Sequence, residues 1–224
     1  MALADLIRAK TDRAVEPCFL ELTRPTIAEG LERLVERGAE RITIAPLLLF
    51  AAGHAKRDIP AEVAEVVNRH PNLQIDQLPA LESHELLLEL SARRYREAIA
   101  CRPTTDPQDT MLVMVGRGSH DAEATAEMHR FAQLRAEGTP VGRLLVCFLA
   151  MQRLSLADAL AEAAASGYPR LIVQPHLLFH GLLYDEIQAT VESHRRQSQK
   201  EWILTSVLGP EPELADAVID LVGR

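Results

Sequence analysis

One stretch decides the fold of this chain: Pro46-Leu-Leu-Leu-Phe-Ala-Ala-Gly-His54-Ala-Lys-Arg-Asp-Ile-Pro60. Its first part is an apolar run, which is typical of a strand buried on both faces of a parallel sheet. The run breaks at Gly53, and Pro60 suits the first turn of a following helix. We therefore expect His54 at the carboxyl end of a buried strand, which is where open α/β sheets bind their ligands.

The composition of the chain is that of an ordinary globular protein. Of its 224 residues, 47% are hydrophobic and 25% are charged, and the length allows one large domain or two smaller ones. A net charge of -8 and an aromatic content of 4% argue against nucleic acid as a partner. The sequence contains no apolar run of membrane-spanning length and no signal peptide, which predicts no membrane partner. Three cysteines without a CxxC pair fit the reducing cytoplasm.

Helical and strand-like patterns alternate along the first half of the chain. The patterns predict helices at 2–12, 26–37, 60–69 and 83–99, and strands at 15–22, 40–50 and 73–78. This alternation favours βα units on a parallel sheet. Residues 102–109 are polar and contain two prolines, which is typical of a linker. The predicted organisation is an N-terminal domain at 1–101, a linker at 102–109 and a C-terminal domain at 110–224.

The second half repeats the first at a constant offset of 129 residues. Cys18-Phe-Leu recurs as Cys147-Phe-Leu, and Pro46-Leu-Leu-Leu-Phe50 recurs as Pro175-His-Leu-Leu-Phe179. The same offset relates Arg24 to Arg153, Leu31 to Leu160, Gly38 to Gly167, Arg41 to Arg170 and Leu73 to Trp202. The sequence thus predicts a duplicated α/β domain, two parallel sheets flanked by helices that face one another across a cleft.

The first repeat lacks the opening strand and Gly-rich loop that the second has at 111–121, because the offset places their counterparts before Met1. A parallel sheet without that strand has an unpaired edge. Three explanations are open: a shortened or mis-assigned start, a true loss, or a replacement strand from a partner chain. The first of these is favoured.

Several segments carry a family resemblance. The stretch Phe50–Pro60, together with Phe19–Ile27 and Leu78–His84, resembles the signature of the sirohydrochlorin cobaltochelatases, the CbiX type of class II chelatase. Val115–Asp121 and the run from Pro175 resemble the degenerate C-terminal domain of the two-domain members. The resemblance implies a cytoplasmic enzyme that inserts Co²⁺ (Fe²⁺ or Ni²⁺ in relatives) into sirohydrochlorin, an octacarboxylate tetrapyrrole of the cobalamin and siroheme pathways. The metal ion is then a substrate, and no tightly bound cofactor is implied.

The chain departs from the family pattern at one catalytic position. The family uses two histidines, one in a His-Gly-Ser-Arg loop after the first strand and one at the position of His54. Only His54 is present, because the first loop would precede Met1. The second half has Arg117 and, after a one-residue deletion, Leu182 at the two positions. Two alternatives to an enzyme therefore remain: a non-catalytic relative that binds a tetrapyrrole or a metal ion, and a structural partner of a complete chelatase.

The residues themselves suit such a reaction. An imidazole acts near neutral pH as a base or as a ligand for Co²⁺ or Fe²⁺, so His54 is the expected catalytic residue and metal ligand. Lys56, Arg57 and Arg117 are candidates for pairing with substrate carboxylates. The weaker candidates for substrate binding are His84, His176 and His180, with His120 beside them. The competing interpretations are a structural histidine at a strand end and a solvated helix approach at Lys56-Arg57. The physiological metal and a possible homo-oligomer are not decided by the sequence.

Overall fold

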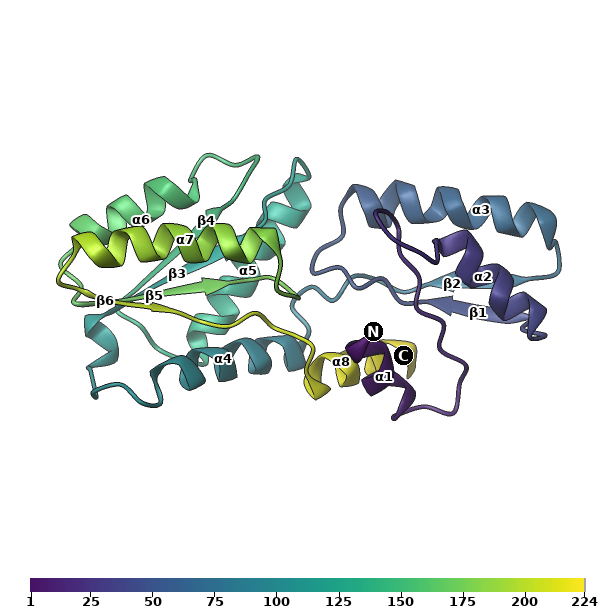
Figure 1. Ribbon diagram of the computed structural model, residues 1–224, viewed down its shortest axis with the longest axis horizontal. Coiled ribbons are helices and arrows are strands. Elements are labelled where there is room, and N and C mark those ends of the chain that lie inside the picture. Colours follow the sequence, from purple (N-terminus) through teal and green to yellow (C-terminus); the bar gives the residue numbers. More distant parts are fainter. Residues whose placement is uncertain (224) are drawn as a thin grey trace. The chain divides into compact units, whose positions relative to one another are not determined.

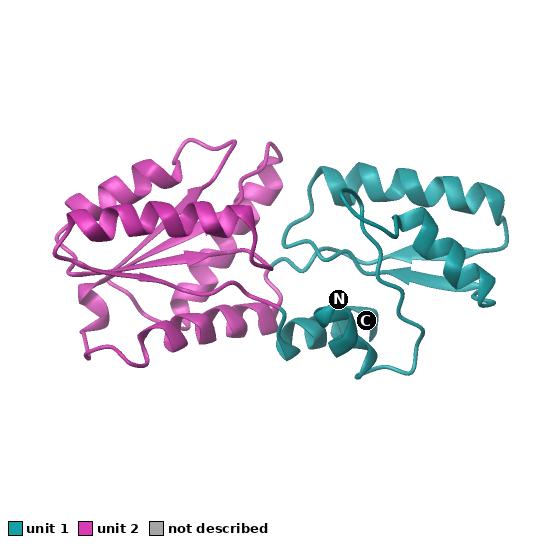
Figure 2. Ribbon diagram, viewed as in Figure 1, with its two compact units in different colours: residues 1–82, 210–224 teal, residues 83–209 magenta. Residues whose placement is uncertain are grey.

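The structure, a computed structural model, describes residues 1–223 and separates into two compact units (Figure 2). Unit 1 contains Met1–Glu82 together with the chain from Pro210 onward, and unit 2 contains Ser83–Gly209. Each unit is an α/β assembly built on a parallel sheet, as the sequence predicts. Over the described residues, no helix combines the length and apolar character needed to cross a membrane.

Unit 2 is built on a four-stranded parallel sheet. Its strands are β3 (Thr110–Gly116), β4 (Arg143–Phe148), β5 (Arg170–Pro175) and β6 (Glu201–Leu204), in the order β4-β3-β5-β6. The two central strands, β3 and β5, are buried along their whole length. Continuous apolar burial of this kind is what a parallel sheet covered on both faces requires.

Helices cover both faces of this sheet (Figure 1). On one face lie α6 (Leu156–Ala165) and α7 (Leu182–Gln197), and on the other α4 (Glu85–Ile99) and α5 (Ala122–Glu137). Side chains alternate along β3, so Met111, Val113 and Val115 enter the core that α6 and α7 cover.

Unit 1 has a two-stranded sheet, in which β1 (Arg41–Ile44) pairs in parallel with β2 (Gln74–Gln77). Helices α2 (Ile27–Glu36) and α3 (Ile59–Arg69) supply most of its core side chains. The remaining helices of the unit, α1 (Ala2–Arg8) and α8 (Pro212–Gly223), pack against each other. A salt bridge of 2.7 Å between Lys10 and Asp216 accompanies this packing.

The two units exchange a helix relative to the two sequence repeats. Helix α4 ends the first repeat but belongs to unit 2, and α8 ends the second repeat but belongs to unit 1. Residues 102–109, expected as a linker, connect α4 to β3 inside unit 2. The compact units therefore differ from the division into 1–101 and 110–224, because the apolar face of α4 is buried in unit 2.

A buried polar network fixes α4 to unit 2. The side-chain amide of Gln174 on β5 donates to the carbonyl oxygen of Ser91 at 2.7 Å. The guanidinium of Arg135 lies 4.9 Å from the centre of the Tyr95 ring and donates to Gln174 at 3.3 Å. Burial lowers the pKa of Arg135 to about 10. These side chains are fully or almost fully buried. Their hydrogen bonds therefore fix the position of α4 within unit 2.

The strand predicted at 15–22 is wrong. That segment is extended but forms only an isolated bridge from Phe19 to Thr26, the counterpart of the bridge from Phe148 to Ser155 in unit 2. In unit 2, the equivalent strand β4 pairs with β3 alone. Within residues 1–223, unit 1 contains no counterpart of β3, so this segment has no neighbour with which to form a ladder.

The strand predicted at 40–50 is too long, and its expected burial on both faces is also wrong. Strand β1 ends at Ile44, residues 46–50 form a loop, and Leu47 is 37% exposed. In unit 2 the equivalent Pro175 still pairs with Val115 of β3, but within residues 1–223 unit 1 has no counterpart of β3, so its ladder ends earlier. Ile42 is buried whereas Arg41 and Thr43 are exposed, so only one face of β1 is well covered.

Local interactions stabilise the helix ends of unit 1. Thr26 caps α2 with a complete capping box, in which its hydroxyl accepts from Glu29 N–H and the Glu29 carboxylate accepts from Thr26 N–H. Pro60 lies in the first turn of α3. Helix α1 ends at Arg8, earlier than the pattern over 2–12 predicts.

Candidate functional site

His54 lies in a single π-helical turn that leads into α3. This turn, η1 (His54–Asp58), follows the loop from β1, and the N–H of Ile59 donates to the carbonyl oxygen of His54. The wider turn replaces the simple loop that the sequence suggests before Pro60. Single π-helical turns of this kind are frequent at functional sites. The histidine therefore stands, as expected, beyond the carboxyl end of β1, on a turn with defined geometry.

The π-turn is held from two directions. Gln77, the last residue of β2, donates its side-chain amide to the carbonyl oxygen of Ala55 at 2.9 Å. On the other side, the guanidinium of Arg57 lies over Gly53, where an added Cβ would come within 2.8 Å of Arg57 Nη2. The absence of a side chain at Gly53 gives Arg57 this position. Strand β2 and the packing of Arg57 over Gly53 thus both contribute to the placement of the turn that carries His54.

The imidazole of His54 is paired with a carboxylate that the sequence interpretation missed. His54 Nδ1 lies 2.8 Å from Asp58 Oδ2, with the two side chains 36% and 46% exposed. A carboxylate only accepts, so the hydrogen lies on Nδ1 and the lone pair of the neutral ring lies on Nε2. The spacing i, i+4 was the available signal, because such residues share a helical face.

The cationic candidates of unit 1 flank this histidine. Lys56 and Arg57 belong to the same π-turn and are both exposed. The turn therefore presents an imidazole and two cations within four consecutive residues. That combination suits a ligand that carries carboxylates and accepts a metal ion.

Unit 2 has a different surface at the equivalent place. Leu182 begins α7 and is 87% exposed, and Phe179 before it is 42% exposed. His180 is exposed and its ring meets Tyr184 edge-on, with ring centres 4.5 Å apart. This end of β5 therefore offers apolar side chains and one histidine in place of the His54 turn.

Arg117 and His120 lie in a loop with a defined structure of its own. Both side chains are exposed. Gly118 has a φ of 91°, and a Cβ there would collide with the carbonyl oxygen of Ala150. Asp121 ends the loop by capping α5, accepting from Glu123 N–H at 2.9 Å. The absence of a side chain at Gly118 thus lets the two loops pack closely, and Arg117 remains exposed.

Two further histidine candidates have structural surroundings. His84 is the N-cap of α4 and accepts from Leu86 N–H at 3.3 Å. His176 is 2% exposed, with its ring centre 4.1 Å from that of Phe131. Burial lowers the pKa of His176 to about 3, so its ring is neutral at physiological pH. Because its side chain is enclosed, His176 is not part of the site proposed below.

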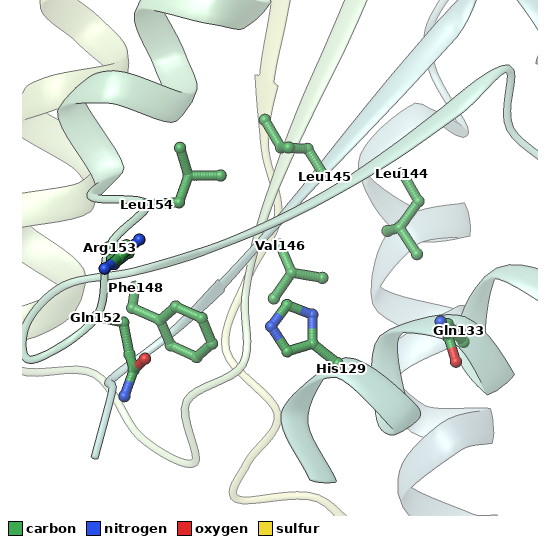
Figure 3. A pocket seen from close by; sticks show the side chains of 9 residues that line it. All are labelled: His129, Gln133, Leu144, Leu145, Val146, Phe148, Gln152, Arg153 and Leu154. Carbon is green, nitrogen blue, oxygen red and sulfur yellow. The ribbon is translucent and has the colours of Figure 1, made fainter. Parts of the chain in front are cut away.

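A groove elsewhere in unit 2 contains none of the predicted site residues (Figure 3). It has a volume of about 460 Å³ and lies along the edge strand β4. Leu144, Val146 and Phe148 form its apolar floor, and His129 and Gln133 of α5 border it. Because none of the predicted site residues lines it, we place the candidate site at the histidine of η1 instead of in this groove.

No cluster of three or more His, Cys, Asp or Glu side chains suited to a metal ion occurs among residues 1–223.

The fold and this turn define the class: a duplicated α/β protein with an exposed histidine turn beyond the carboxyl end of a parallel sheet. The CbiX family model matches residues 1–98 and 111–224, nearly the whole chain. The chain therefore belongs to the CbiX family.

The named relatives of this chain are sirohydrochlorin chelatases. The chain is 35% identical over 217 residues to "Sirohydrochlorin ferrochelatase" of Priestia megaterium, covering 96% of this chain and 80% of that protein. It is 27% identical over 201 residues to "Sirohydrochlorin cobaltochelatase" of the same organism, covering 89% of this chain and 65% of that protein. Among solved structures, "SirB from Bacillus subtilis with Fe3+" matches with a TM-score of 0.88 and 29% identity, over 99% of this chain and 86% of that one.

Proposed function

We propose that this protein is a metal chelatase that inserts a divalent first-row metal ion, Fe²⁺ or Co²⁺, into sirohydrochlorin. The observation that carries the proposal is the His54 turn, where a half-exposed imidazole stands beside two exposed cations. Membership of the CbiX family and the names of the relatives support the same reaction. The reaction belongs to siroheme or cobalamin synthesis, and the three free cysteines suit the cytoplasm.

His54 has two compatible tasks in this reaction. The macrocycle loses two pyrrole N–H protons as the metal ion enters, so the step requires a proton acceptor. The lone pair on His54 Nε2 can accept such a proton or hold the incoming metal ion. A single imidazole binds Fe²⁺ or Co²⁺ weakly, which allows transfer of the ion to the four nitrogens of the macrocycle.

The cations of the same turn would position the substrate. Sirohydrochlorin carries eight carboxylates, as its class implies, and Lys56 and Arg57 project from the turn that holds His54. A guanidinium pairs with a carboxylate through two parallel hydrogen bonds, which fixes orientation as well as position. Arg117 and His180 of unit 2 are further exposed candidates for contact with the substrate periphery.

The first experiment is a metalation assay on His54→Ala. Sirohydrochlorin is mixed with Co²⁺ or Fe²⁺ under anaerobic conditions, and the change in its absorbance is followed against the spontaneous rate. We expect the enzymatic rate to fall by at least about 10²-fold, the typical contribution of one acid–base group. Since His54 is only half-buried, the circular dichroism spectrum should stay unchanged.

Leu182→Ala is the matched control, because Leu182 occupies the equivalent position in unit 2 and is 87% exposed. Its metalation rate should equal that of the unaltered chain. Equal rates for His54→Ala and Leu182→Ala would contradict the proposal. If the unaltered chain binds sirohydrochlorin but does not accelerate metalation, the protein is instead a tetrapyrrole-binding relative of the chelatases.

A further inference from the structure

The carboxylate of Asp58 lies in hydrogen-bond contact with His54. The distance from Nδ1 to Oδ2 is 2.8 Å, which is short for an N–H···O bond and typical of a charge-assisted one. The two residues are four apart on a turn that Gln77 fixes to β2. We propose that Asp58 is a positioning residue that holds His54 in the Nδ1–H form and directs Nε2 to the substrate.

The contact contributes little to the stability of the fold. The two side chains are 36% and 46% exposed, and an exposed i, i+4 ion pair adds little to the free energy of unfolding. The turn has other supports, in the Gln77 bond to Ala55 and the backbone bond from Lys56 N–H to the carbonyl oxygen of Ala52. The ring of His54, by contrast, is held by this carboxylate.

The tautomer of the ring decides whether His54 can act. In water, a neutral imidazole side chain favours the form with hydrogen on Nε2, which leaves the lone pair on Nδ1, next to the backbone. A carboxylate at Nδ1 reverses that preference, because it accepts only from an N–H. It also raises the basicity of the opposite nitrogen, as carboxylate partners do for metal-binding histidines.

The inference deepens the proposed function and rests on it for the catalytic consequence. The tautomer itself, however, is a property of the free protein and can be measured without a substrate. The first arm of the test is the long-range ¹H–¹⁵N spectrum of the imidazole rings at a pH where they are neutral. The His54→Ala spectrum identifies the signal of His54.

We expect the Nδ1–H form for His54 in the unaltered chain and a shift toward the Nε2–H form in Asp58→Ala. The second variant, Asp58→Asn, keeps the size of the side chain and should give a mixture of the two forms. Glu186→Ala is the matched control, because Glu186 is an exposed carboxylate at the equivalent place on α7. It should leave the His54 signal unchanged. An Nε2–H form in the unaltered chain would overturn the proposal.

The second arm is the metalation rate. For Asp58→Ala, kcat should fall by about 10–100-fold, the usual effect of removing such a partner, while KM for sirohydrochlorin stays unchanged. A shifted tautomer with an unchanged kcat would overturn the positioning role. If the unaltered chain does not metalate at all, the proposed function fails, and the spectra alone then decide whether Asp58 sets the tautomer.

Discussion

The two units began as copies of one domain, and the difference between their sheets shows what a single strand contributes. In unit 2, β3 lies between β4 and β5, and both central strands are buried from end to end. In unit 1, the counterpart of β5 is β1, which is four residues long and buried at one of them. The counterpart of β4 is the extended segment around Cys18, which forms no ladder.

The loop that follows this segment is nevertheless preserved. Leu22 and Met151 occupy equivalent positions and both have left-handed backbones, with φ values of 67° and 65°. Both side chains are exposed. The bridges from Phe19 to Thr26 and from Phe148 to Ser155 close the same turn. The local geometry of the turn therefore does not depend on the central strand, whereas strand formation does.

The largest expected difference between the units concerns their cores. Leu160 and Leu31 are repeat equivalents, 0% and 3% exposed. Leu160→Ala should lower the free energy of unfolding of unit 2 by about 4 kcal/mol, because the four-stranded core around the residue cannot collapse into the cavity. Leu31→Ala should cost about 2 kcal/mol, since the smaller core of unit 1 can relax. Amide hydrogen exchange resolved by unit measures both. Equal costs would show that the two cores are equally rigid.

The second comparison concerns pH, because His176 of unit 2 has Leu47 as its counterpart in unit 1. The folded pKa of His176 is about 3 and its ordinary value is 6.5, so the unfolded state binds the proton more tightly. The stability of unit 2 is therefore complete above pH 6.5 and falls as the pH drops toward 3. We expect a loss of about 2 kcal/mol at pH 5, at about 1.4 kcal/mol per pH unit.

Denaturant unfolding at pH 7.5 and pH 5 measures this loss. His176→Leu, which installs the residue of unit 1, should remove most of the pH dependence. A variant that keeps the full dependence would assign the acid sensitivity of unit 2 to other groups.

The smallest expected effect concerns the packing of α2 against the unpaired segment. A Cβ on Gly30 would lie 2.8 Å from Cys18 Cβ, whereas the equivalent position in α6 is the buried Ala159. Gly30→Ala gains about 1 kcal/mol of helix propensity and loses about 1–3 kcal/mol to overpacking. The net result should be a loss of about 1 kcal/mol in thermal or denaturant unfolding.

Ala159→Gly is the reverse substitution. It should lower the free energy of unfolding by about 1 kcal/mol through the lower helix propensity of glycine alone. A stabilised Gly30→Ala would mean that the segment around Cys18 moves away from α2 without cost.

The sequence predicted what depends on neighbouring residues along the chain. The placement of Pro60 and the helices α2, α3 and α4 follow from local patterns, and the structure contains them. The repeat predicted the architecture, and the signature around His54 predicted the family.

What the sequence did not predict depends on partners distant in the chain. The segment 15–22 has strand composition, yet a strand requires a neighbour to accept its hydrogen bonds. The destination of α4 depends on which sheet face its apolar side meets, a tertiary property. Asp58 was missed because the π-turn brings it to His54, although the four-residue spacing was visible.

The helix exchange has a consequence for synthesis of the chain on the ribosome. Unit 2 is continuous from Ser83 to Gly209 and can close as soon as that stretch has emerged. Unit 1 is made first but must wait for α8, which is translated after all of unit 2. At about 5–20 residues per second, this delay is on the order of ten seconds. The unit that carries His54 is therefore the last of the two to be completed.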